Sequence, residues 1–115
     1  MELSELQGLS KDYGAALLEE LERKQSLSFA EEELKEAEVF ALKAASDAGE
    51  IYSRNAEVRK LQLSAAIADS VSCRRARSSI DTCQCEVDNA RAECARLDAE
   101  IGLTKAWLYS QARIG

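Results

Sequence analysis

The amino-acid sequence has a helical pattern along almost its whole length, and the clearest interruption is Ser-Asp-Ala-Gly-Glu-Ile-Tyr-Ser-Arg-Asn at residues 46–55. Gly49 can take a left-handed backbone conformation without steric cost, and Asp47 and Ser53 are typical of helix ends and helix caps. We therefore predict that one helix ends near residue 48 and that another begins near Ser53. The chain would reverse direction there, so that its two long flanks fold against each other as an antiparallel pair.

The composition is typical of a helical bundle or coiled coil. The 115 residues include no proline and only five glycines, so long uninterrupted helices are permitted. Hydrophobic residues make up 46% of the chain, but much of this fraction is alanine and only 5% of the residues are aromatic. Such a chain forms a narrow core of small side chains, without a deep pocket.

Apolar residues recur at steps of three and four in both halves of the chain, which is the spacing of one face of an α-helix. In the second half this series runs through Val58, Leu61, Ala65 and Ala68, and then without interruption from Cys73 to Leu108. We call the series from Cys73 to Leu108 the seam. Its regularity favours coiled-coil packing against another helix.

Two all-α architectures fit these patterns. Asp88-Asn89 is a plausible helix start within the seam, and a break there gives a single domain over residues 1–115, an elongated, spectrin-like antiparallel three-helix bundle. Its helices would span about 2–46, 52–87 and 89–113. Without that break the chain forms a two-helix antiparallel coiled-coil hairpin. The arms of the hairpin would lie near 3–48 and 56–101. Periodicity slightly favours the hairpin, and compactness favours the bundle.

Acidic residues are concentrated in residues 1–46, which carry eleven acidic and five basic side chains, whereas residues 47–115 carry ten of each. Phosphate backbones and anionic lipids repel such a chain, so we do not expect it to bind nucleic acid or a membrane surface. The sequence also has no apolar run of 18 residues and no basic-then-apolar leader segment. We therefore expect a cytoplasmic protein.

The antiparallel pairing also makes a prediction about a basic cluster in the second half. With a turn near residue 51, Arg74, Arg75 and Arg77 fall opposite the acid-rich stretch from Glu19 to Glu33. We therefore interpret this cluster as an internal complement to the acidic helix, and not as a nucleic-acid patch.

Few residue patterns point to catalysis or to a bound metal. The chain contains no histidine, which excludes imidazole-based catalytic triads and histidine-ligated metal sites. Cys73, Cys83 and Cys94 lie on the seam, where cysteine packs as a small hydrophobic residue. Cys85 lies off the seam and would be the most reactive thiol. We expect no enzymatic activity, no cofactor and no metal site.

The turn and the segment after it resemble a known family. Gly49-Glu50-Ile51-Tyr52, followed by Leu61-Gln62 and by Ser64, is similar to the loop and second helix of the tubulin-binding cofactor A family, whose members have about this length. The pattern of that family is a Gly-Glu-x-Tyr turn and then a helix with Leu-Gln-x-Ser, ending in Pro-Asp. Ile67-Ala68-Asp69 occupies the region of that ending, without the proline and with a shift of one residue.

The resemblance implies a three-helix bundle that acts as a tubulin-folding chaperone, binding β-tubulin during its folding and passing it on without a cofactor. It also implies a cytoplasmic protein of the microtubule cytoskeleton that is a monomer or a weak homodimer. A helical surface with charged faces suits this role because it offers contact area and electrostatic register. The implied partner-binding residues are exposed side chains around the matched helix, namely Tyr52, Glu57, Arg59, Lys60 and Gln62.

Two other functions agree with the same sequence. The chain would be a coiled-coil scaffold or stalk if it self-associated through the seam between Ile80 and Leu108, and sedimentation would then show a dimer. It would be a small secretion-type chaperone if its acidic first helix held an aggregation-prone partner. That chaperone would co-purify with a bacterial partner and would not bind tubulin.

Overall fold

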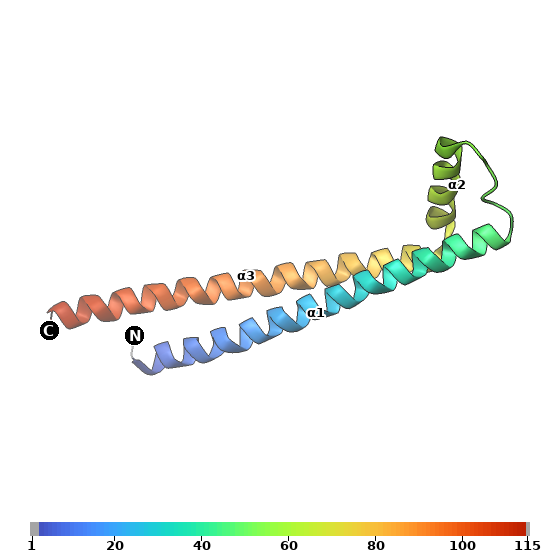
Figure 1. The fold of residues 1–115 in the computed structure, drawn as a ribbon. Helices are drawn as coiled ribbons and strands as arrows, with labels where there is room; N and C mark the ends of the chain where they lie inside the picture. Colours follow the sequence, from blue (N-terminus) through green and yellow to red (C-terminus); the bar gives the residue numbers. More distant parts are fainter. Residues whose placement is uncertain (1–2, 115) are drawn as a thin grey trace. The chain divides into compact units, whose positions relative to one another are not determined.

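Three α-helices make up the fold in the computed structural model, which describes residues 3–114 (Figure 1). They are α1 (Leu3–Asp47), α2 (Ala56–Asp69) and α3 (Val71–Ile114). No strand occurs among the described residues. The predicted all-α class with three helices is therefore confirmed, and the first helix matches its predicted bounds within one residue.

The end of α1 lies where the sequence predicts it. Gly49 has a φ angle of 75°, in the left-handed region that glycine enters without steric cost. The N–H of Glu50 donates to the carbonyl of Ala45 at 3.0 Å, and the N–H of Gly49 donates to that of Ser46 at 3.1 Å. These two bonds form a Schellman motif, which satisfies carbonyls that the end of a helix leaves without an intrahelical partner.

The second helix begins at Ala56, four residues later than the predicted start at residue 52. Asn55 is its N-cap, because the Asn55 Oδ1 accepts hydrogen bonds from the N–H groups of Glu57 at 2.9 Å and Val58 at 3.2 Å. The Ser53 Oγ in turn accepts from the Asn55 N–H at 3.2 Å. Ser53 therefore supports the capping residue instead of starting the helix itself.

The break in the second half lies at Ser70 and not at Asp88-Asn89, so the predicted helices 52–87 and 89–113 are wrong in their bounds. The single arm 56–101 of the hairpin alternative is wrong for the same reason. Ser70 is extended, with φ −73° and ψ 120°, and its N–H donates to the Ile67 carbonyl at 3.2 Å. Its Oγ accepts from the Cys73 N–H at 3.3 Å, so one residue ends α2 and caps α3.

Asp88 lies within an uninterrupted stretch of α3. The side-chain amide of Gln84 donates to the Asp88 carboxylate at 3.0 Å, one turn away on the exposed side of the helix. Such a pair at four-residue spacing stabilises a helix interior. Asp88 therefore strengthens the helix that it was predicted to interrupt.

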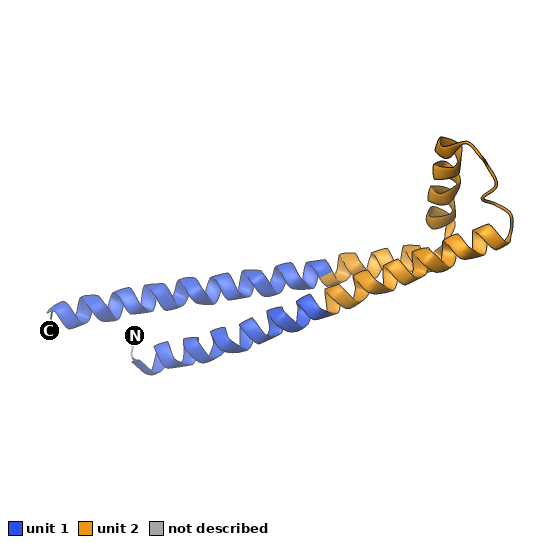
Figure 2. Ribbon diagram, viewed as in Figure 1, with its two compact units in different colours: residues 1–25, 84–115 blue, residues 26–83 orange. Residues whose placement is uncertain are grey.

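The contacts within the chain divide it into two compact units (Figure 2). Unit 1 combines the first part of α1, up to residue 25, with α3 from residue 84 onward. Unit 2 comprises residues 26–83 and so contains the turn and all of α2. The single domain predicted over residues 1–115 stays a prediction.

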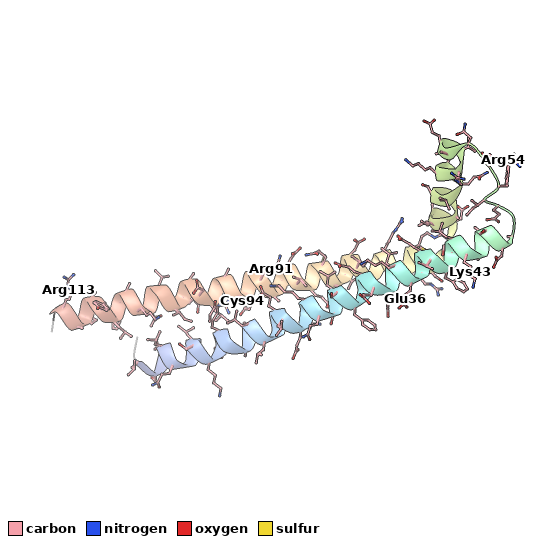
Figure 3. The ribbon with its side chains drawn as sticks, viewed as in Figure 1. Glu36, Lys43, Arg54, Arg91, Cys94 and Arg113 are labelled. Atoms are coloured by element: carbon pink, nitrogen blue, oxygen red, sulfur yellow. The ribbon has the colours of Figure 1, made fainter. Side chains whose placement is uncertain are left out.

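In unit 1, α1 and α3 pack against each other as antiparallel helices. Their core consists of Ala16, Cys94 and Leu97, with Leu9 and Tyr13 packed against it. Cys94 lies on the side of α3 that faces α1 (Figure 3). The buried residues are mostly small, as the high alanine content and low aromatic content predict.

Ion pairs between the two helices fix their register. In unit 1, Arg23 contacts Glu86 at 3.1 Å and Arg91 contacts Glu20 at 3.8 Å. Both pairs are partly exposed, so they contribute at most about 1 kcal/mol each and serve mainly to select the register.

The predicted register of the basic cluster is wrong. In unit 2, Arg77 pairs with Glu38 at 3.9 Å, which lies outside the predicted stretch from Glu19 to Glu33. Residues 56–69 form a separate helix, α2, and do not continue the pairing as the prediction assumed. Because these residues do not pair with α1, each residue of α3 lies opposite a later residue of α1 than the prediction assumed.

Candidate functional site

The helix α2 presents an apolar face to solvent. None of its residues is buried, and its side chains at heptad spacing are all exposed. We call this face the α2 stripe. Leu61, at its centre, has 69% of its surface exposed. The α2 stripe consists of Val58, Leu61, Ala65 and Ala68.

The loop before α2 is held against the helix by one side chain. The Gln62 Oε1 accepts hydrogen bonds from the backbone N–H groups of Tyr52 at 3.2 Å and Ser53 at 3.3 Å. The side chain of Tyr52 remains 78% exposed, beside the start of the helix. Gln62 is half-buried and positions the loop, so the exposure that the resemblance implies for it is wrong.

The predicted partner-binding residues on α2 do not coincide with the α2 stripe. Glu57, Arg59 and Lys60 are all exposed, as predicted. However, Arg59 and Lys60 lie about 100° and 200° around the helix axis from Val58, because each residue advances a helix by about 100°. They therefore lie off the α2 stripe, while Glu57 lies beside it.

Sequence reasoning missed Val58 and Leu61 as surface residues. Their spacing belongs to the apolar series of the second half, which predicts a buried helix face, yet both side chains are exposed. The step from Ala68 to Cys73 is five residues, and it departs from the alternation of three and four. That departure is the signal that α2 and α3 have independent faces.

Exposed apolar side chains also occur on the side of α1 that faces away from its core, but charged residues interrupt them. Glu36, for example, lies about one helical turn before Phe40 and therefore on the same side of the helix. No uninterrupted apolar stripe forms there, so α2 is the better candidate for a binding surface. The larger exposed apolar side chains on α1 include Leu18, Leu21, Phe29, Val39 and Phe40.

The four cysteines are free thiols, and their positions differ as the seam predicts. Cys73 and Cys94 are buried, Cys83 is half-buried and Cys85 is exposed. Desolvation raises the pKa of the Cys94 thiol above its ordinary value, and the nearby carboxylates of Glu20 and Glu93 raise it further. Among the described residues, no three cysteine, aspartate or glutamate side chains are grouped so that they could hold a metal ion.

We expect iodoacetamide at pH 8 to modify Cys85 first in the folded protein and to reach Cys73 and Cys94 only after unfolding. The thiolate is the reactive form, and Cys94 is both buried and protonated at that pH. Because its pKa is raised in the folded state, Cys94 contributes stability that is full below the ordinary pKa of 9.0 and is lost as the pH rises through the raised pKa. Peptide mapping by mass spectrometry would follow each site.

Cys85→Ser is the control for this measurement, since it should remove the fast labelling phase and leave the slow phases unchanged. Rapid modification of Cys94 in the folded protein would contradict the packing of unit 1.

None of the three helices, as far as the structure describes them, combines the length and the apolar character that a bilayer crossing requires. Comparison of this chain with models of known protein families, with curated proteins and with solved structures finds no match.

Proposed function

We propose that this chain binds another polypeptide through the α2 stripe and the loop before it, as a folding chaperone whose client is β-tubulin. The observation that carries the proposal is that α2 buries none of its residues and exposes an apolar face at heptad spacing. Amphipathic helices recognise partner helices and grooves through faces of this kind. Burial of Leu61 and Val58 in a complex would contribute about 25 cal/mol for each Å² of apolar surface removed from water.

The positions of the residues that are similar to the tubulin-binding cofactor A family support β-tubulin as the client. The residues that resemble the tubulin-binding cofactor A family, Gly49 to Tyr52 with Leu61, Gln62 and Ser64, belong to one loop and the helix after it. Gly49 ends α1, and Gln62 fastens the loop to α2. Tyr52 and Leu61 are then left exposed on the same segment, where a client can contact them.

The test is the affinity of the full-length protein for β-tubulin diluted from denaturant, measured by biolayer interferometry. We expect Leu61→Glu to weaken binding at least tenfold, because a complex would have to bury an unpaired carboxylate. Leu18→Glu is the matched control, since Leu18 is 64% exposed but lies on α1 in unit 1. If the wild-type protein does not bind β-tubulin, then β-tubulin is not the client. If both variants bind β-tubulin equally well, then the α2 stripe is not the binding surface.

The charged residues need a separate variant. Arg59→Glu combined with Lys60→Glu reverses two exposed charges without touching the α2 stripe. If these residues contact the client, as the resemblance implies, binding weakens. Unchanged binding would show that neither residue belongs to the binding surface and would leave the role of Leu61 intact.

Self-association is a second candidate, and the burial of the seam bears on it. Val87, Cys94 and Leu97 are buried within one chain, so the seam is already covered over its central part. A dimer would therefore form more readily through the exposed α2 stripe. Sedimentation equilibrium distinguishes the two cases. If the chaperone proposal is right, we expect the mass of a single chain. A dimer that Leu61→Glu dissociates would instead show that the α2 stripe is the interface between two copies of the chain.

A further inference from the structure

A second surface lies in unit 1, where the first turns of α1 meet the last part of α3. The two helices enclose an open groove of about 430 Å³ between them. This volume is within the range of about 300–1,000 Å³ that is usual for ligand sites. We call it the acidic groove. The lining residues that matter here are Glu5, Gly8, Leu9, Asp12, Glu100 and Leu103.

The floor of the acidic groove is mostly apolar, although the buried Thr104 also lines it. Gly8 contributes no side chain, and a Cβ atom built at this position would meet no other atom within 4 Å. Leu103 is 69% exposed on the opposite wall, while Leu9 packs against the core of unit 1. The space above Gly8 and beside Leu103 is therefore open to an apolar side chain of a partner.

The rim of the groove carries one sign of charge. Glu5 and Asp12 project from α1, and Glu100 projects from α3, while no basic residue among those that the structure describes lines the groove. Glu100 is engaged by the guanidinium of Arg96, which also binds Glu93 and lowers the pKa of the Glu93 carboxyl. Glu5 and Asp12 form no ion pair with another described residue, so their charges are available to a ligand.

We propose that the acidic groove binds a basic amphipathic helix of a partner protein, through one bulky apolar side chain flanked by two lysines or arginines. Glu5 and Asp12 are seven residues apart and so about 10 Å apart along the axis of α1. Basic residues seven positions apart on a partner helix have the same separation, and an apolar residue midway between them faces the floor. Charge complementarity therefore selects this partner, and the net charge of −6 opposes a second copy of the same chain.

This inference is independent of the proposed function, because the acidic groove belongs to unit 1 and the α2 stripe to unit 2. Leu61→Glu should leave binding at the groove unchanged. A negative result for binding at one surface therefore does not contradict the proposal for the other surface.

The probe is a fluorescein-labelled synthetic helix of 14 residues with one central tryptophan and lysines seven positions apart, measured by fluorescence anisotropy with the full-length protein. We expect it to bind, and we expect a matched peptide with glutamates in place of the lysines not to bind. Binding should weaken as salt rises, since the rim charges are exposed to screening. Equal binding of both peptides, or binding of neither, would overturn the proposal.

Gly8→Leu locates the site, because a Cβ atom at this position meets no other atom within 4 Å and the rest of a leucine side chain would occupy the groove. We expect at least tenfold weaker peptide binding with an unchanged or higher melting temperature, since leucine favours a helix interior more than glycine does. Gly14→Leu is the matched control, an equally uncrowded glycine of α1 that does not line the groove. Equal affinities of the two variants would place the peptide elsewhere and overturn the proposal.

Glu5→Gln combined with Asp12→Asn tests the rim without adding volume. We expect several-fold weaker binding and a smaller dependence on salt. An unchanged affinity would overturn the role of the rim. If the wild-type protein instead sediments as a dimer that Gly8→Leu separates into single chains, the occupant is a second copy and the proposed partner helix is wrong.

Discussion

Leu97→Ala is expected to lower the free energy of unfolding by about 2–4 kcal/mol, the largest effect that we predict for a single substitution. Leu97 is only 4% exposed and belongs to the core of unit 1 with Ala16 and Cys94. Those two neighbours are small, so they cannot fill the space that the lost leucine side chain leaves. The change is a large part of the total stability of about 5–15 kcal/mol that is typical of a domain.

Thermal and urea denaturation followed by circular dichroism at 222 nm would measure this effect. A loss of this size corresponds to a fall in melting temperature of about 10 °C or more. Leu103→Ala is the matched control, because it makes the same chemical change on the same helix at a side chain that is mostly exposed. Equal losses for the two variants would contradict the packing of α3 against α1.

Gly49→Val is expected to destabilise the protein by about 1–2 kcal/mol, the second largest effect. Gly49 adopts a φ of 75°, and a β-branched side chain is strained in that region. The cost is conformational and not steric, because a Cβ atom at this position would meet nothing within 4 Å. The Schellman bonds of Glu50 and Gly49 that end α1 would be lost or weakened as the backbone relaxes.

The control for this prediction is a glycine whose replacement should change the free energy of unfolding in the opposite direction. Gly14 lies inside α1 without an atom near its Cβ position, and Gly14→Ala should stabilise the helix by about 0.5–1 kcal/mol. The two variants differ in where the glycine lies, so denaturation midpoints that move in opposite directions would confirm the backbone argument. A neutral or stabilising Gly49→Val would contradict the left-handed turn.

The sequence predicts the turn after α1 well because local chemistry decides it. Gly49 is the residue that a left-handed C-terminal position prefers, and the helix before it contains no other strong stop. The break at Ser70 is harder to predict, because one serine supplies the hydrogen bonds of both helix ends and no glycine or proline marks the position. Its N–H donates to a carbonyl at the end of α2, and its Oγ accepts from an N–H at the start of α3. The signal for this break is indirect and lies in the five-residue step from Ala68 to Cys73.

The candidate site was predictable only in part. Tyr52, Glu57, Arg59 and Lys60 are exposed as the resemblance implies, since polar and aromatic residues beside a turn seldom have enough neighbours to be buried. The internal role of Gln62 depends on where the loop returns to α2, which no local pattern encodes. The exposure of the α2 stripe depends likewise on tertiary pairing, because α3 takes the place beside α1 that a longer second helix would occupy.

The antiparallel pairing of α1 with α3 also sets the order in which the chain folds. Glu38 and Arg77 are close to the connecting segment in sequence, whereas Arg23 and Glu86 are 63 positions apart. The entropy lost on closing a loop grows with loop length, so contacts beside the connection form at the smallest cost. Each pair that forms shortens the loop that the next pair must close. We therefore expect the contacts of unit 2 to form before those of unit 1.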